Sequence, residues 1–143
     1  SICFEKGKSF DITVEPNIYV KGNENSIKQL LAILLDNAVK YSNESGRIEL
    51  SLTSKNDKVS LSVFNTGVPI PKDNIPHLFE RFYRVDKARS RENGGSGLGL
   101  SIAKRIIENN EASISIISNQ DNGTLFTCTF KAAKTKKKEK NDL

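Results

Sequence analysis

The most constraining feature of the sequence is a glycine-rich stretch, residues 93–100, that runs directly into a helical pattern. Glycine loses more backbone freedom on folding than any other residue, so this density indicates positive φ angles or close approach of a ligand. Beyond the glycines, Leu98, Ile102 and Ile106 recur at helical spacing, with Ala103 and Ile107 beside them. The pattern predicts a loop that leads into a helix over residues 101–109. Free N–H groups and the helix dipole would favour an anion such as phosphate there.

By itself this stretch is equally consistent with a flexible lid or a tight connection that binds nothing. Two well-known phosphate loops are excluded. No Gly-Lys-Ser/Thr follows the glycines, as a P-loop requires, and a charged, turn-rich run precedes them where a dinucleotide fold has a strand. The function therefore depends on the other segments.

A long helix is predicted to begin at Asn25 or Ser26 and to end near residues 42–46. Its core stripe consists of Ile27, Leu30, Leu31, Leu34 and Ala38. A second face, formed by Ile33, Asn37, Lys40 and Tyr41, mixes polar and apolar groups. The helix alone favours an Asn37 that is bonded to a neighbouring loop. The alternative is a neutral oxygen ligand for Mg²⁺, beside a lysine for phosphate and an aromatic ring for a base.

Alternating apolar and polar residues predict two antiparallel hairpins. Residues 47–53 and 59–64 form the first, with residues 54–57 as its turn. Residues 113–118 and 124–130 form the second, joined through 119–123, with Phe126, Cys128 and Phe130 on one side. Residues 10–14 and 18–21 are short and β-prone. One layer of helices on one face of a sheet follows.

The net charge of +5 is unevenly distributed. From Lys131 onward six lysines face only Glu139 and Asp142, a net charge of +4, which leaves +1 for residues 1–130. We expect one domain over residues 1–131 and a disordered lysine-rich tail over 132–143. No apolar run reaches membrane-spanning length. Cys3 and Cys128 share no metal-ligand spacing and are expected to be thiols in a reducing compartment.

The segment that follows the first hairpin carries polar and cationic groups. Residues 65–71 place a polar side chain and a glycine turn at a strand end, which indicates either a ligand edge or an ordinary turn. Residues 73–80 resume helical spacing and lead to Arg84, which is either a solvated cation or an arginine aimed at phosphate oxygens. His77, the single histidine, has no neighbours that suggest catalysis.

Taken together, the segments resemble the catalytic, ATP-binding domain of a sensor histidine kinase, whose fold is shared with gyrase, heat-shock protein 90 and mismatch-repair proteins. Residues 34–41 resemble the N box of that family, 65–70 its first glycine box, 79–84 its F box, 95–100 its second glycine box and 123–126 its closing strand motif. The resemblance covers about residues 10–130. The four boxes, in this order and at compatible spacing, are far more specific than any one of them.

The resemblance implies an α+β fold, a two-layer α/β sandwich of the Bergerat type. In it, three helices cover one face of a mixed, mostly antiparallel sheet. It also implies ATP and Mg²⁺ as cofactors, held between the first long helix and a mobile lid over about residues 84–96.

By resemblance, Asn37 coordinates Mg²⁺, Lys40 approaches phosphate and Tyr41 lies beside the adenine. Arg84 reaches the terminal phosphate, so Asn37, Lys40 and Arg84 are the candidate catalytic residues. Backbone N–H groups at residues 97–99 would cradle the phosphates, and Thr124 would help to bind adenine through water. The full set of further nucleotide-binding candidates is Asn65, Gly67, Ile70, Gly95, Gly97, Leu98, Gly99 and Thr124.

Three departures from the family pattern affect these expectations. Asn65 stands where the family usually has Asp, and a neutral amide accepts the hydrogen bond of the adenine amino group more weakly. Ile33 stands where relatives have Asn or a catalytic Glu, which disfavours water activation. Asn110-Glu111-Ala112 stands where the family tends to show His-Gly-Gly, so this turn is expected to be built differently.

The implied function is donation of the ATP γ-phosphate to a histidine on a dimerisation hairpin, for onward transfer to an aspartate of a response regulator. No such hairpin lies in residues 1–143, so the domain alone is not expected to phosphorylate itself. The implied parent protein is a membrane-anchored homodimer, with this domain in the cytoplasm and no direct contact with nucleic acid.

Three alternatives remain open. Asn65 and Ile33 would also fit a nucleotide-sensing regulatory module that has lost kinase activity. The basic tail would fit a nucleic-acid-binding module, although the nearly neutral body disfavours it. A related anti-sigma-factor kinase would use a protein serine as acceptor.

Overall fold

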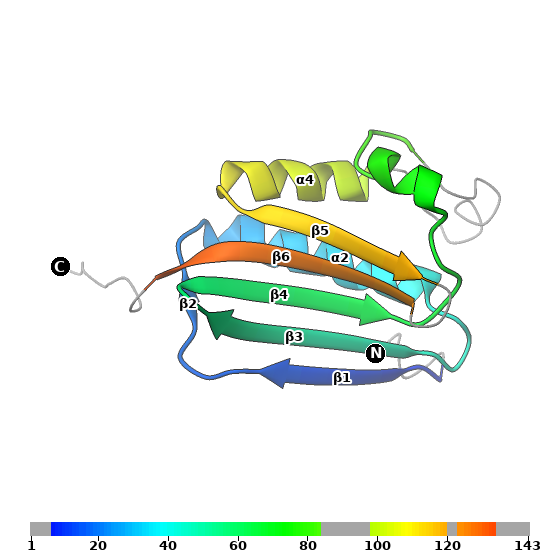
Figure 1. The fold of residues 1–143 in the computed structure, drawn as a ribbon, viewed down its shortest axis with the longest axis horizontal. Helices are drawn as coiled ribbons and strands as arrows, with labels where there is room; N and C mark the ends of the chain where they lie inside the picture. Colours follow the sequence, from blue (N-terminus) through cyan, green and yellow to red (C-terminus); the bar gives the residue numbers. More distant parts are fainter. Residues whose placement is uncertain (1–6, 84–97, 120–122, 134–143) are drawn as a thin grey trace.

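The computed structural model describes residues 7–83, 98–119 and 123–133, which form a six-stranded sheet and a layer of helices (Figure 1). The strands are β1 (Ser9–Val14), β2 (Tyr19–Val20), β3 (Arg47–Lys55), β4 (Lys58–Asn65), β5 (Ser113–Asn119) and β6 (Gly123–Ala133). Their order is β1-β3-β4-β6-β2, and β5 also pairs with β6. β1 runs parallel to β3, and the remaining pairs are antiparallel. The expected mixed, mostly antiparallel sheet is confirmed.

Two α-helices, α2 (Glu24–Tyr41) and α4 (Gly99–Asn109), lie over one face of this sheet (Figure 1). The described residues also contain the 3₁₀ helix η1 (Lys72–His77), which is shorter than the helix expected over residues 73–80. Pro76 lies inside it and has no N–H to donate, which disfavours a regular α-helix. η1 is followed by Leu78, which is buried, and by Phe79, which packs against the core.

The first long helix begins slightly earlier than predicted. Asn23 is the N-cap, and its side-chain oxygen accepts a hydrogen bond from the backbone N–H of Ser26 at 2.8 Å. The helix ends at Tyr41, and the N–H of Ser42 still donates to the carbonyl of Ala38. The whole predicted polar face, residues 33–41, therefore lies on continuous α-helix.

The core lies between the helices and the sheet. Leu30, Leu34 and Ala38 of α2 are buried, and Ile27 and Leu31 pack at the edge of the core, as the stripe predicted. The buried residues of α4 are Ala103, Ile106 and Ile107, whereas Ile102 is 40% exposed. The predicted helical spacing of Leu98, Ile102 and Ile106 is present, but of these three residues only Ile106 is buried. The face of α4 that meets the core is centred between Ala103 and Ile107, which turns Ile102 toward solvent.

The strands keep the predicted alternation. Val59, Leu61 and Val63 of β4 and Phe126, Cys128 and Phe130 of β6 are buried on the helix side. The β3–β4 turn is tighter than the expected four residues, because only Asn56 and Asp57 separate the strands. Both adopt positive φ, +53° and +63°, as two-residue hairpin turns require. β6 continues through Ala133, and its last residues pair with β2.

Candidate nucleotide site

Two buried polar side chains mark one end of the sheet. Asn65 ends β4 and Thr124 lies near the start of β6, and the two residues are direct partners in the sheet register. Each is only 4% exposed. Because side chains alternate along a strand, both point to the helix side, as the buried Val63 and Phe126 do. Buried polar groups need hydrogen-bond partners, so this end of the sheet is a candidate ligand site.

A short chain of hydrogen bonds fixes the loop after β4 to the same place. The hydroxyl groups of Thr124 and Ser118 lie 2.7 Å apart, and the Ser118 oxygen accepts the backbone N–H of Ile70 at 2.8 Å. Ser118 was not among the site residues predicted from the sequence. The signal was present, because Ser118 continues the inward-facing register of Ile114 and Ile116 with a polar residue.

Gly67 brings the loop after β4 against the end of α2. Its φ is +151°, and a Cβ built there would lie 2.5 Å from the carbonyl oxygen of Tyr41. No side chain fits at that distance. The glycine therefore allows the first predicted glycine motif to contact the helix that carries Asn37, Lys40 and Tyr41.

The polar face of α2 lies as predicted, with Asn37, Lys40 and Tyr41 half-buried. The Lys40 ammonium lies 3.2 Å from the carboxylate of Asp36, in an ion pair whose side chains are 27% and 64% exposed. Partly exposed ion pairs of this kind contribute little to stability.

The start of α4 lies against the same face of α2. A Cβ built on Gly99 would lie 3.6 Å from Cγ2 of Ile33, one helical turn before Asn37. The N-cap residue of α4 is Leu98, and no side chain from the described residues caps this N-terminus. The first N–H groups of an α-helix have no intrahelical partner, and such groups favour anions.

Three candidates, Arg84, Gly95 and Gly97, lie outside the described residues, as does the lid expected over residues 84–96. The other candidates come from α2, the end of β4, the start of β6 and the start of α4. The structure brings these elements together at one end of the helix layer (Figure 1).

The turn at residues 110–112 is organised by the side chain of Asn110. The Asn110 side chain accepts the Asn23 N–H at 2.8 Å and donates to the Ser26 hydroxyl at 3.1 Å. It therefore links the end of α4 to the start of α2. Glu111 follows with a φ of +54°.

A hollow of about 350 Å³ lies on the other face of the sheet, away from these residues. It is lined by Asp11, Thr13, Glu49, Leu50, Ser51, Ser62, Phe64 and Leu125. Most of these side chains alternate with the buried ones, so the hollow belongs to the open face and takes no part in the candidate site.

The described residues contain no group of three or more His, Cys, Asp and Glu side chains able to hold a metal ion. A magnesium ion that arrives with a nucleotide needs only one or two protein oxygens, because phosphates and water supply the rest. The half-buried amide of Asn37 fits that donor set. None of the helices in the described ranges is long and apolar enough to cross a membrane.

Comparison with known proteins agrees with this geometry. The family model described as histidine kinase-, DNA gyrase B-, and HSP90-like ATPase matches residues 22–134. The chain therefore belongs to this family of ATP-binding domains, with the α+β fold expected from the sequence.

The similar proteins narrow the class. Sensor histidine kinase YkoH of Bacillus subtilis (strain 168) is 50% identical over 118 residues, which are 82% of this chain and 26% of that protein. The solved structure of the mycobacterial sensor histidine kinase MprB has a TM-score of 0.80 and 28% identity, covering 92% of this chain and 88% of that one. The solved structure of histidine kinase ThkA in complex with response regulator protein TrrA has a TM-score of 0.75 and 26% identity. The match covers 94% of this chain and 37% of that one.

Within its family, the chain is similar to the ATP-binding domains of sensor histidine kinases. The match spans 26% of the length of its curated relative YkoH, about a quarter.

Proposed function

We propose that this domain binds Mg-ATP between α2 and the start of α4 and donates the γ-phosphate to a histidine elsewhere in the whole protein. The observation that carries the proposal is the pair of buried polar residues, Asn65 and Thr124, at the sheet end that meets α2. A pocket with a few convergent polar groups between a sheet end and a helix is a common form of cofactor site.

Asn65 is the proposed reader of the adenine amino group. Its amide nitrogen donates to the carbonyl of Thr66 at 3.1 Å, and this bond orients the side chain. No donor from the described residues reaches its Oδ1. A buried acceptor without a donor is what an incoming amino group would satisfy. Thr124 supports the same end of the nucleotide through water, and Tyr41 and Ile70 contribute apolar contact.

The triphosphate side is formed by α2 and the start of α4. Asn37 would hold the magnesium ion, which when bound neutralises part of the triphosphate charge. Lys40 and Arg84 would add positive charge. The N–H groups at residues 97–99 would bind phosphate oxygens, and Gly95 would belong to the same nucleotide-binding loop. Phosphoryl transfer depends on such positioning and charge stabilisation more than on covalent chemistry by the protein.

The position one turn before Asn37 favours transfer to a protein over hydrolysis. Ile33 lies there and packs toward the core, so no carboxylate is available at that place to activate a water molecule. The identity of the relatives as sensor histidine kinases supports a histidine as acceptor over a regulatory module without kinase activity.

The partners of the whole protein follow from the same class. ThkA was solved with a response regulator protein, and we propose a response regulator as the onward acceptor here as well. The phosphoacceptor histidine would lie on a dimerisation hairpin of a membrane-anchored homodimer, with this domain in the cytoplasm.

Replacing Asn37 tests the site directly. We expect Asn37→Ala and Asn37→Asp to weaken Mg-ATP binding by about 100-fold or more, because a magnesium ligand is lost or acquires a charge that alters the site. Titration calorimetry with Mg-ATP measures this effect, and circular dichroism checks that the fold is intact. Asn25→Ala, an exposed asparagine on the same helix, is the matched control. An unchanged titration for folded Asn37→Ala would remove this residue from the site.

Transfer is tested by mixing the domain with the histidine-bearing hairpin of its own full-length protein and labelled ATP. Acid-labile, base-stable label on the hairpin is expected, and no label on the domain alone. ATP binding without any phosphohistidine would contradict the kinase proposal and favour the regulatory module.

A further inference from the structure

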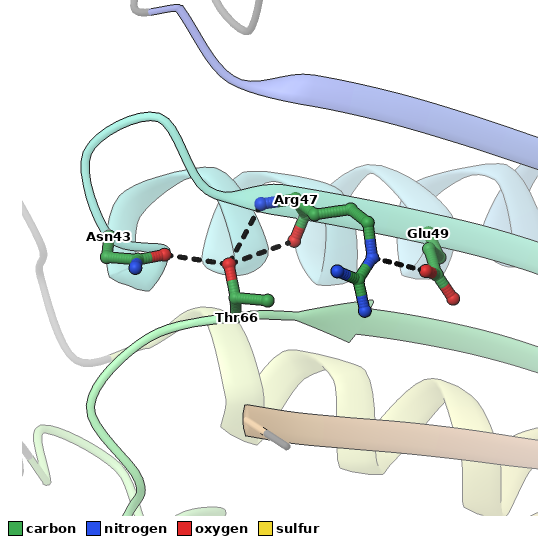
Figure 2. Close-up of polar contacts among 4 residues, drawn as sticks. All are labelled: Asn43, Arg47, Glu49 and Thr66. Carbon is green, nitrogen blue, oxygen red and sulfur yellow. Dashed lines mark hydrogen bonds and ion pairs between the residues drawn. The ribbon is translucent and has the colours of Figure 1, made fainter. Parts of the chain in front are cut away.

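A cluster of hydrogen bonds joins the loop after α2 to the turn after β4 (Figure 2). The hydroxyl of Thr66 donates to Oδ1 of Asn43 at 2.7 Å and accepts the backbone N–H of Arg47 at 2.8 Å. The main chain adds two bonds, from the Asn43 N–H to the Thr66 carbonyl at 3.2 Å and from the Thr66 N–H to the Arg47 carbonyl at 3.0 Å. We call Thr66 and Asn43, with these bonds, the Thr66–Asn43 clamp.

The surrounding chain is shaped around this clamp. A Cβ built on Gly46 would lie 2.2 Å from Oδ1 of Asn43 and 2.6 Å from the hydroxyl of Thr66, so the clamp occupies the space of a side chain. Lys8 holds the same loop from the other side, because its ammonium donates to the carbonyls of Ser42 at 3.1 Å and Asn43 at 2.9 Å.

The clamp lies directly beside the proposed nucleotide site. Thr66 separates Asn65 from Gly67, and Asn43 follows Tyr41 by two residues. The carbonyl of Thr66 accepts both the Asn43 N–H and the side-chain amide of Asn65, the latter at 3.1 Å. The group that fixes the orientation of Asn65 is therefore itself fixed by the loop that ends α2.

We propose that Thr66 and Asn43 are positioning residues that determine the preference for adenine. This inference rests on the proposed Mg-ATP site. The clamp sets the position of Oδ1 of Asn65 relative to α2, so that this oxygen accepts the adenine amino group. It does not contact the triphosphate, which is bound from α2 and α4. Loss of the clamp should therefore weaken the reading of the base and leave phosphate binding nearly unchanged.

Thr66→Val tests the proposal, because valine keeps the shape of threonine and lacks the hydroxyl. We expect Mg-ATP binding to weaken by about fivefold, the usual effect of losing one hydrogen bond, here the proposed bond from the adenine amino group to Oδ1 of Asn65. Inosine triphosphate has a carbonyl in place of the amino group, so its binding should change less than about twofold. The preference for ATP over inosine triphosphate should fall accordingly. A general loss of stability would weaken both nucleotides alike.

Thr66→Ser should restore the ATP preference, because serine keeps the hydroxyl. Thr127→Val is the matched control: it removes a hydroxyl that lies 3.3 Å from that of Ser62 on the open face, away from the site. Asn43→Ala provides a second variant that removes the acceptor from an exposed loop and should reproduce the effect of Thr66→Val.

Folded Thr66→Val and Asn43→Ala proteins that keep the wild-type preference would overturn the inference while leaving the nucleotide site in place. Wild-type protein that binds neither nucleotide would instead refute the proposed function, and the inference with it. The two failures are thus distinguishable in one set of titrations.

Discussion

At the scale of single residues, Asn65 shows how a buried polar group can be fixed in orientation and still be incomplete. Its side-chain nitrogen is bonded to the Thr66 carbonyl, and the residue is 4% exposed. Leaving an acceptor buried without a donor costs free energy. At the proposed site the adenine amino group would supply that donor, and the cost would be recovered on binding.

Asn65→Asp should strengthen ATP binding and weaken the fold. A carboxylate accepts the adenine amino group in a charge-assisted hydrogen bond, and we expect about three- to tenfold tighter binding. The Thr66 carbonyl loses one of its two donors at the same time and faces a negative charge, which should lower the free energy of unfolding by about 1 kcal/mol. Nucleotide titration and urea unfolding measure the two effects.

Asn74→Asp, at a half-buried position in η1, is the control and should leave ATP affinity unchanged. Equal or weaker ATP binding by Asn65→Asp would show that the adenine amino group is not read by this side chain.

At the scale of elements, the two helices are held together at the end opposite the glycine motif. Asn110 is the C-cap of α4 and is bonded to the start of α2: its side-chain oxygen accepts the Asn23 N–H, and its side-chain nitrogen donates to the Ser26 hydroxyl and to the carbonyl of Ile106 at 2.8 Å. Because α2 and α4 form the two walls of the proposed triphosphate site, their relative position matters for function as well as stability.

Asn110→Ala should lower the free energy of unfolding by about 2 kcal/mol, since three hydrogen bonds of a helix-linking cap are lost. Asn109→Ala, the exposed preceding residue, should change it by less than about 0.5 kcal/mol. Urea unfolding followed by circular dichroism gives both values. Equal effects of the two substitutions would mean that the cap does not hold the helices.

At the scale of the whole molecule, one core connects helices and sheet, and Cys128 lies in it with 0% exposure. Burial raises the pKa of the Cys128 thiol from 9.0 to about 12. Because the folded-state pKa is the higher one, ionisation of the thiol has no effect on the free energy of unfolding at neutral pH. It lowers the free energy of unfolding as the pH rises above about 9.

Labelling of Cys128 should therefore report opening of the whole core. In a Cys3→Ser background at pH 8, we expect iodoacetamide to react at least about 10³-fold more slowly with folded than with urea-unfolded protein. Stabilisation by Mg-ATP should slow labelling further in proportion to ligand concentration. Fast labelling of the folded protein, followed by mass spectrometry, would contradict a single closed core.

Much of the local structure could be read from periodicity. The stripe of α2 and the inward registers of β4 and β6 are local patterns of residue type, and each is buried as predicted. Ile102 shows the limit, since a helix with apolar residues on more than one face does not reveal which face meets a neighbour. The 3₁₀ form of η1 depends on Pro76, which the helical spacing alone did not take into account.

The sequence by itself determined the helices, the hairpins, the ordered motifs and hence the family, because these depend on spacing along the chain. Only the tertiary structure showed the parallel pairing of β1 with β3 and the contact of Gly67 with Tyr41. It alone also showed the hydrogen bond from Ile70 to Ser118 and the Thr66–Asn43 clamp. These features join residues far apart in sequence. Hydrogen bonds of this kind depend on distances of a few tenths of an ångström, which residue type and spacing do not specify.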